Sequence, residues 1–284
     1  MPETERIERL HLEGLADYHC HCDYSSDASG TIDEYCHAAV QRGLAEICFT
    51  THYDHNPNTQ GTPEFILVKG ERRPVGPESL AHYVDDVRRA ARRFLPLGLS
   101  VQLGLEFGWY NGCEQHVCDL RKRFDIEYML CGVHELDNSC FCCHTLYERC
   151  FGRYSVRAMV ETYIEHVIHA TESGLFQTIA HLDYVRKYGS MYYGPELDAV
   201  LSDLIPGLFP ALIKSGTSIE INTAGLRQGI GAYYPDMSTV NVARRAGVEV
   251  GFIGSDAHRP AQVGYDFDAA GALVPRPIGG CESC

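Results

Sequence analysis

The sequence predicts an α/β fold with parallel strands, built from seven consecutive strand–helix units. Apolar segments rich in β-branched residues recur along the whole chain, and longer amphipathic segments lie between them. This alternation is typical of βα units that form a parallel sheet. The chain has 284 residues, 45% of them hydrophobic, which is enough for one large core. Neither an internal repeat nor a low-complexity linker divides it, and we therefore expect one domain over residues 1–284.

Strands are expected where short apolar runs rich in β-branched residues are bounded by polar or turn-forming residues. Runs of this length favour a strand over a helix. The seven predicted strands are residues 15–21, 44–51, 99–107, 126–134, 175–181, 217–222 and 248–255.

Several of the intervening segments have helical signals. Residues 77–94 begin with Pro77, a residue suited to the first helical position, and their apolar residues recur at helical spacing. Pro206 and Pro210 interrupt a later segment, so we expect that helix to kink or split. The predicted helices are residues 31–42, 77–94, 155–172 and 197–214.

Two long connections and the C-terminal tail have no such pattern. Residues 53–76 and the cysteine-rich residues 135–154 are longer than most loops of a compact domain, and loops of that length are usually functional or disordered. We expect the short tail, about residues 272–284, to be flexible.

Composition restricts the possible partners. The formal net charge is −14, which opposes binding to a phosphate backbone because such binding depends on Lys and Arg releasing counterions. Extended nucleic acid is therefore an unfavourable partner, whereas a small anionic metabolite could bind where local cations reverse the field. No segment has the apolar length of a membrane span or a signal peptide, and we expect a soluble cytoplasmic protein.

The thirteen cysteines are numerous, but their odd count does not indicate a disulfide framework. Cys140, Cys142, Cys143 and Cys150 lie around His144, and Cys281 and Cys284 form a C-terminal CxxC motif. A small zinc site is one alternative. The spacing does not match a zinc finger, and it favours reduced thiols without a metal.

Histidine, aspartate or glutamate stands at or just beyond the end of every predicted strand. In a closed parallel barrel, the carboxyl ends of the strands meet on one face, so seven separate segments would contribute to one pocket. Six of the fourteen histidines occupy these positions, and we expect the other eight, His55 included, to be structural or surface residues. In strand order, the terminal residues are His19 and His21, His52, Glu106, His134, His181 and Asp183, Glu220 and Asn222, and Asp256 and His258.

This residue set predicts a metal centre. Because side chains alternate along an extended chain, His19 and His21 point to the same side, as do Asp256 and His258. Imidazole and carboxylate ligands without thiolate suit Zn²⁺, Mn²⁺ or iron. A carboxylate such as Glu106 can bridge two ions, and a pair of ions ~3.5–4 Å apart can lower the pKa of a bound water to ~7.

The motif series also resembles a known family. The segments DYHCH, TTH, GLE, GVH, AHLD, EIN and GSDAH, in this order, cover almost the whole chain and resemble the PHP (polymerase and histidinol phosphatase) superfamily. AHLDYVRKYG and GSDAHRPAQVG resemble segments of its single-domain histidinol-phosphate phosphatases. The resemblance implies a distorted seven-stranded, TIM-like (β/α)7 barrel, one phosphoesterase domain and two to three divalent metal ions.

The resemblance also implies roles for individual residues. Asp17 would fix an imidazole tautomer, and Arg186 and Arg259 would hold the substrate phosphate. The ligands of one ion would be His19, His21, Glu106 and Asp256. Those of a second would be Glu106, His134 and His181, and those of a third His52, His258 and Asp27.

Some residues depart from the family pattern. Cys22 stands where Ser or Thr is common, and TTH replaces the frequent TDH. The cysteine-rich segment 135–154 lies where a substrate-facing loop is expected. These differences concern the substrate more than the metal ligands.

The resulting hypothesis is metal-dependent hydrolysis of a small phosphomonoester, with L-histidinol phosphate as the best single candidate. Glu106, Asp256 and His258 would lie at the catalytic centre. A phosphodiesterase or exonuclease acting on short nucleotides is an alternative, which a panel of phosphorylated substrates would distinguish. A non-catalytic, metal-binding regulatory module is another, although such a degenerate site should lack ligands.

Overall fold

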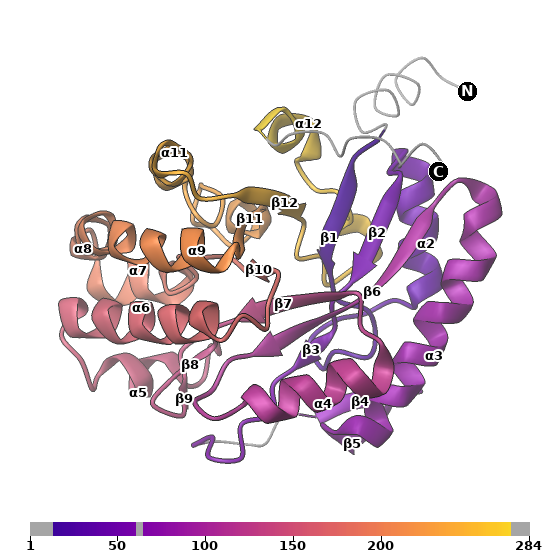
Figure 1. Ribbon diagram of the computed structural model, residues 1–284, viewed down its shortest axis with the longest axis horizontal. Helices are drawn as coiled ribbons and strands as arrows, with labels where there is room; N and C mark the ends of the chain where they lie inside the picture. Colours follow the sequence, from indigo (N-terminus) through magenta and orange to yellow (C-terminus); the bar gives the residue numbers. More distant parts are fainter. Residues whose placement is uncertain (1–13, 61–64, 274–284) are drawn as a thin grey trace.

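Seven parallel strands form the inner wall of a nearly closed barrel, and helices surround it (Figure 1). The computed structural model describes residues 14–60 and 65–273, so most of the predicted tail, with Cys281 and Cys284, lies outside the described residues. The predicted fold class is confirmed. In spatial order, the strands are β1 (Ala16–Cys20), β2 (Glu46–Phe49), β6 (Ser100–Gly108), β7 (Tyr128–Gly132), β10 (Thr178–Ile179), β11 (Ser218–Asn222) and β12 (Val250–Gly254).

The second predicted strand, residues 44–51, contains β2, and the short β3 (His52–Tyr53) follows just beyond its predicted end. Both pieces pair with β6 in one register, in which Glu46 lies opposite Ser100 and His52 opposite Glu106. Between them, the amide of Thr50 donates to the carbonyl of Cys20 in β1. The interruption therefore does not shift the register, and it brings a histidine beside the glutamate of the next strand.

The first and last strands meet through the residues that follow β12. A parallel bridge joins Cys20 to Ala257, and the His21 amide donates to the Ala257 carbonyl over 2.8 Å. The buried carboxylate of Asp17 accepts hydrogen bonds from the Ser255 amide (2.9 Å) and the Gly264 amide (2.8 Å). One side chain of β1 thus fixes the chain after β12.

The predicted helices are present. Thr31 forms a capping box with Glu34 at the first, and Ser155 caps α6. The segment with Pro206 and Pro210 splits as predicted, into α8, a short 3₁₀ turn and α9. The longer helices are α2 (Ile32–Arg42), α3 (Pro77–Phe94), α4 (Glu114–Phe124), α6 (Val156–Glu172), α7 (Arg186–Tyr193), α8 (Glu196–Leu204), α9 (Phe209–Ser215) and α11 (Met237–Ala246).

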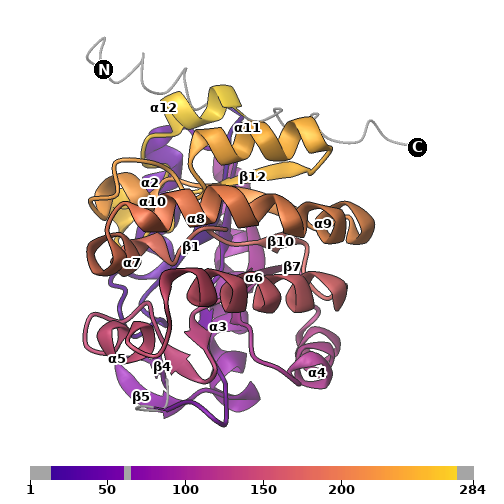
Figure 2. The ribbon, with the colours of Figure 1, turned by 90° about the vertical axis from the view of Figure 1, so that its left-hand side faces the viewer.

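The helices lie in groups around the barrel. Figure 2 shows α6, α8 and α11 stacked along one side, where α6 packs against both α8 and α9. On the opposite side α3 packs against β6 and α2. Shorter helices are α5 (Tyr147–Phe151), α10 (Ala224–Arg227) and α12 (Phe267–Ala270).

The two long connections contain structure that the sequence analysis did not anticipate. The first includes the antiparallel hairpin of β4 (Phe65–Val68) and β5 (Glu71–Pro74). The second includes the hairpin of β8 (Glu135–Leu136) and β9 (Ser139–Cys140), followed by α5. Strands of two to four residues are too short to show a periodic pattern, which is why the sequence did not reveal them.

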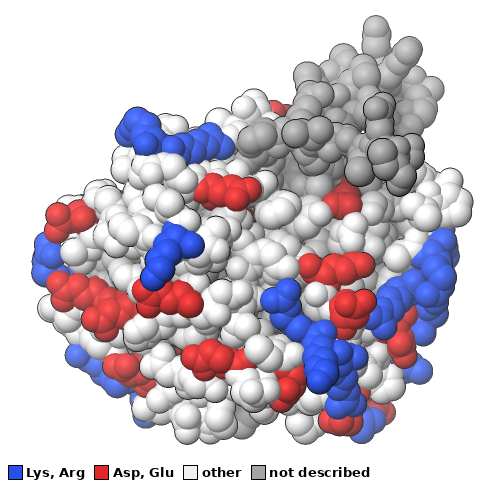
Figure 3. Space-filling model, in the orientation of Figure 1, with Lys and Arg blue, Asp and Glu red and all other residues white. Residues whose placement is uncertain are grey.

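The described helices are all too short or too polar to cross a lipid bilayer. On the face drawn in Figure 3, basic and acidic side chains are interspersed over the surface.

Close packing inside the barrel leads to a prediction about Gly254, at the end of β12. A Cβ atom there would clash with the Glu220 carboxylate and lie 2.5 Å from Cβ of His19. We expect Gly254→Ala to lower the free energy of unfolding of the metal-free protein by about 1–3 kcal/mol, the usual cost of overpacking. Urea denaturation measures this. Gly207→Ala, where the added Cβ would meet nothing within 4 Å, is the control, and equal stability of the two variants would refute the account.

Candidate metal centre

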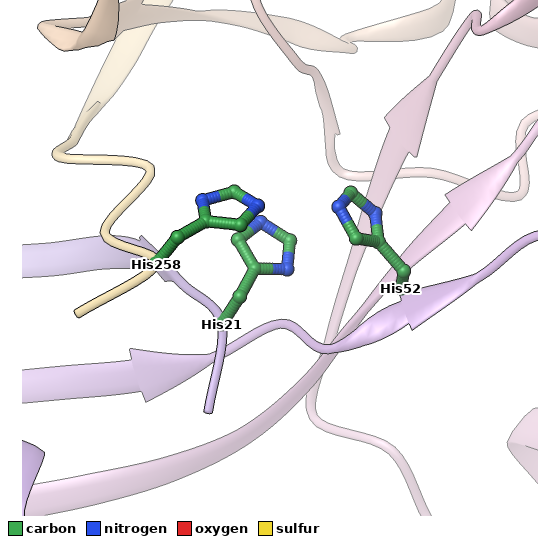
Figure 4. Close-up of side chains that lie close together, drawn as sticks. All are labelled: His21, His52 and His258. Carbon is green, nitrogen blue, oxygen red and sulfur yellow. The ribbon is translucent and has the colours of Figure 1, made fainter. Parts of the chain in front are cut away.

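Histidines and carboxylates from separate strand ends meet at the carboxyl end of the barrel. The chain after β1 supplies His21, β3 supplies His52, and the loop after β12 supplies His258; Figure 4 shows these three rings pointing toward one another. The ring centroids of His21 and His258 are 4.3 Å apart, and the ring centroids of His21 and His52 are 4.1 Å apart. The convergence inferred from strand-end positions is therefore present in the fold.

Glu106 is the common neighbour of the imidazoles. Its side chain is fully buried on β6. The residues around it come from both neighbouring strands and from across the barrel. The contacting ring atoms are Nε2 of His181 (2.9 Å), Nδ1 of His52 (2.9 Å), Nε2 of His134 (3.3 Å), and Nε2 of His19 and of His21 (3.4 Å each).

Asp256 and Asp27 complete the set on the side of the last strand. Asp256 lies 3.2 Å from Nε2 of His21 and 3.6 Å from Nε2 of His19. The exposed Asp27 lies 3.3 Å from Nε2 of His258 and 3.9 Å from Nε2 of His52. All nine residues proposed as ligands from the sequence thus lie in one contiguous cluster.

Within this cluster, four groups of three side chains each place one ligand atom per residue within 4.8 Å of the others. Two of the groups share Glu106, as expected for a carboxylate that serves more than one ion. The groups are His19–His21–Asp256, His19–Glu106–His181, His52–Glu106–His134 and His21–His52–His258.

Hydrogen-bond acceptors behind the imidazole rings orient them. The sequence analysis did not predict this role for Glu220 or Asp54. Glu220 lies 2.8 Å from Nδ1 of His19, and Asp54 lies 3.1 Å from Nδ1 of His134. Nδ1 of His258 lies 3.0 Å from the carbonyl of Asp256. A carbonyl can only accept, so this Nδ1 carries the proton, and Nε2 is left free to bind a metal.

The role expected for Asp17 was wrong. Its carboxylate accepts from backbone amides at the junction of β1 and β12, and Glu220, not Asp17, is the partner of the His19 ring. Glu220 lies two residues before the end of β11, and its position near a strand end could be seen in the sequence. Asp54 follows His52 by two residues, and alternation along the chain was the available signal for it.

Two of the proposed ligands have left-handed backbone conformations. His181 has φ of 29° and Asp256 has φ of 51°, a region that non-glycine residues seldom adopt. At His181 the amide leaves the strand ladder and donates to the Glu220 carboxylate over 3.0 Å. Such strain persists where the surrounding structure fixes it, and it is concentrated at functional sites.

The electrostatics of the centre are dominated by burial and by mutual contact of opposite charges. Burial opposes ionisation of Glu106, but His19, His52 and His134 outweigh it and hold its pKa well below the usual range. Burial also lowers the pKa of His52, yet Glu106 and Asp27 raise that pKa to about 9. The pKa of His21 is lowered, by burial and by the neighbouring imidazoles.

The chemistry of the cluster fits a bound metal. Nε2 of His19, Nε2 of His21 and Oε2 of Glu106 are buried and have no hydrogen-bond partner among the described residues. Buried polar atoms are normally satisfied, and imidazole nitrogen and carboxylate oxygen are the ligands that Zn²⁺, Mn²⁺ and iron accept.

Three arginines lie near the strand ends. Arg186 is held by the carboxylates of Asp183, Asp198 and Asp236, at 3.4, 2.8 and 3.3 Å. Arg259, next to His258, is exposed.

Arg227 was not singled out from the sequence. Its Nη2 donates to the carbonyls of Ser255 (2.9 Å) and Asp256 (3.0 Å), while its buried Nη1 has no partner in the described part of the chain. This places a guanidinium against the backbone of a proposed ligand, with one donor free.

Comparison with known proteins identifies the same family as the sequence motifs. The family model described as PHP domain matches residues 17–224. The chain is 31% identical over 274 residues to a protein of Deinococcus radiodurans named probable histidinol-phosphatase, covering 95% of both chains.

Solved structures share the fold. One, assigned as a histidinol phosphatase from Listeria monocytogenes, has a TM-score of 0.75 and 18% identity, covering 89% of this chain and 98% of that one. Another, histidinol phosphate phosphatase from Lactococcus lactis with zinc, L-histidinol and phosphate, has a TM-score of 0.70 and 19% identity, covering 87% of each chain. Because the family match extends from β1 through β11 and the relative aligns over nearly the whole length, the chain belongs to the PHP domain family.

Proposed function

We propose that this protein is a metal-dependent phosphomonoesterase that hydrolyses L-histidinol phosphate to L-histidinol and phosphate. The observation that carries the proposal is the cluster in which Glu106 contacts five imidazoles at the open end of the barrel. The relative at 31% identity is named probable histidinol-phosphatase, and the Lactococcus lactis structure contains zinc, L-histidinol and phosphate. Both support a small phosphorylated substrate.

The cluster would hold two to three divalent metal ions. Zinc is supported by the Lactococcus lactis structure, and the same ligand types also suit manganese and iron. One ion would use His19, His21, Glu106 and Asp256, a second Glu106, His134 and His181, and a third His52, His258 and Asp27. When bound, such ions supply Lewis-acid polarisation of the phosphoryl group and activation of water.

Hydrogen bonds within the chain orient the imidazole rings of the cluster in the absence of metal and substrate. Glu220 and Asp54 accept from Nδ1 of His19 and His134, which leaves Nε2 of each ring directed at Glu106. Asp17 holds the chain after β12 against β1. The ligands are therefore positioned by hydrogen bonds that do not depend on the metal, which limits reorganisation on binding.

The substrate phosphate needs cationic donors beside the cluster, and we propose three arginines for this role. Arg227 has a free Nη1 and is fixed next to Asp256, and Arg259 is adjacent to His258 and exposed. Arg186 is nearby but engaged by three aspartates, so contact with phosphate would require exchange of one of them. A planar guanidinium matches two phosphate oxygens.

The direct test is a phosphate-release assay on metal-loaded enzyme with L-histidinol phosphate, sugar phosphates and short oligonucleotides. We expect L-histidinol phosphate to have the highest kcat/KM, and chelation to abolish turnover until metal is restored. Preference for oligonucleotides would instead establish a phosphodiesterase. Full activity in protein that elemental analysis shows to be metal-free would refute the metal-dependent reaction.

Glu106→Gln should be among the most damaging single substitutions. The amide keeps the shape of the side chain but removes the charge that lies against the imidazoles, so metal content and turnover should fall together. Elemental analysis and phosphate release measure the two effects. Glu161→Gln on the exposed side of α6 is the matched control. Normal metal content and rate in Glu106→Gln would exclude a shared ligand role for this residue.

Arg227→Ala and Arg259→Ala should retain metal and fold but lose kcat/KM by ~10²-fold or more, because each removes a charge-assisted donor to the transition state. Lysine at either position should restore only part of the loss, since it cannot form the planar fork. Arg157→Ala, which is exposed on α6, is the control. A variant with parental kcat and KM would remove its arginine from the phosphate site.

A further inference from the structure

Three cysteine side chains converge beside the metal centre, in the segment after β8. One sulfur atom from each of Cys140, Cys142 and Cys143 lies within 4.8 Å of the other two. The Cys140 and Cys142 sulfurs are 3.6 Å apart, and those of Cys140 and Cys143 are 2.6 Å apart. All three residues have free thiols.

The backbone of this segment is fixed by its own hydrogen bonds. Asp137 and Asn138 both have positive φ and form the turn between β8 and β9, as a two-residue hairpin requires. The Phe141 amide donates to the His134 carbonyl over 3.1 Å, and the Cys143 carbonyl accepts from the amides of Leu146 and Tyr147. The cysteines are therefore held on an ordered turn between the hairpin and α5.

Phe141 anchors this turn in the core. Its ring is buried against Phe151 and Tyr163. Cys140 is itself buried, and Cys142 and Cys143 beside it are partly buried.

We propose that Cys140, Cys142 and Cys143 form a thiolate site for a thiophilic divalent cation of the Zn²⁺ class, separate from the histidine and carboxylate centre. Sulfur atoms ~2.3 Å from a tetrahedral zinc ion lie ~3.7 Å from one another, close to the separation of Cys140 and Cys142. The sulfurs of Cys140 and Cys143, 2.6 Å apart, are closer than this spacing. Rotation of the Cys143 side chain would separate them to the distance that zinc ligation needs. Three protein ligands leave a fourth position for water or another ligand.

A Cys140–Cys143 disulfide is the competing outcome, but it would use only two of the three convergent sulfurs. Thiolate ligation accounts for all three.

The thiolate site is next to the proposed active site. One cavity is lined by the three cysteines together with His134, Asp54 and Trp109. An ion bound by the three cysteines would fix the wall of this cavity, which also includes His134, a proposed ligand of the histidine and carboxylate centre. The binding site itself is independent of the reaction proposed above.

Cobalt loading tests the thiolate site without measuring turnover. Metal-free, reduced protein is titrated with Co²⁺, and the near-ultraviolet thiolate-to-cobalt charge-transfer band is recorded alongside bound metal. The main centre has no proposed thiolate ligand, so the band would report the cysteines alone. We expect the band in the parent protein, its loss on addition of Zn²⁺, and its absence from the variant with Cys140→Ser, Cys142→Ser and Cys143→Ser, which should bind one equivalent less metal.

Cys118→Ser on exposed α4 and the pair Cys281→Ser and Cys284→Ser are controls that should keep the band. If the triple variant does not fold, as judged by circular dichroism, Cys142→Ser alone should weaken Co²⁺ binding at this site by at least ~10-fold. The proposal is overturned if the reduced parent protein shows no band, if the band persists in the triple variant or at full affinity in Cys142→Ser, or if only the Cys281/Cys284 variant loses it.

Discussion

A carboxylate buried among imidazoles is the constraint around which this barrel is organised. An ionised glutamate that leaves water loses several kcal/mol of solvation unless positive charge replaces it. Glu106 meets that requirement because strand register sets His52 directly opposite it. Space is limited as well: at Gly132 on the next strand, a Cβ would lie 2.7 Å from Oε1 of Glu106 and 2.6 Å from Nε2 of His134. The backbone of β7 can therefore approach only because that residue has no side chain.

Buried carboxylates near the strand ends connect the barrel to the candidate metal centre. Glu220 orients the His19 ring and also accepts the amide of His181, so one carboxylate serves two strand ends. Asp17 contributes nothing to the rings but joins the chain after β12 to β1. These supports are backbone and side-chain hydrogen bonds close to the strand ends, so the closed barrel fixes where the segments after β1 and β12 place their candidate ligands.

How much of this was predictable from sequence depends on the kind of signal. The seven strands could be predicted because buried parallel strands leave long apolar runs, and the candidate ligands could be picked out because they stand at the ends of those runs. The two hairpins were not, because strands as short as Glu135–Leu136 carry no period. Arg227 was missed because it stands in a short helix after strand six, and a carbonyl partner such as that of Asp256 leaves no trace in sequence. The convergence of Cys140, Cys142 and Cys143 depends on a turn whose conformation the residues alone did not specify.

Closure of the barrel through Asp17 has a consequence for how the protein comes to be assembled. The Asp17 carboxylate and the Ser255 amide are separated by 238 positions in the chain, and the histidines next to Asp17 share their cluster with Asp256. Contacts of such large sequence separation form late, because loop-closure entropy must be overcome before they contribute any stabilisation. During synthesis, His19 and His21 emerge with β1, whereas their carboxylate partner Asp256 emerges only after β12. The residues of the cluster that are made earliest gain this partner only after the last strand of the barrel, so a nascent chain cannot assemble the complete cluster until all seven strands have been made.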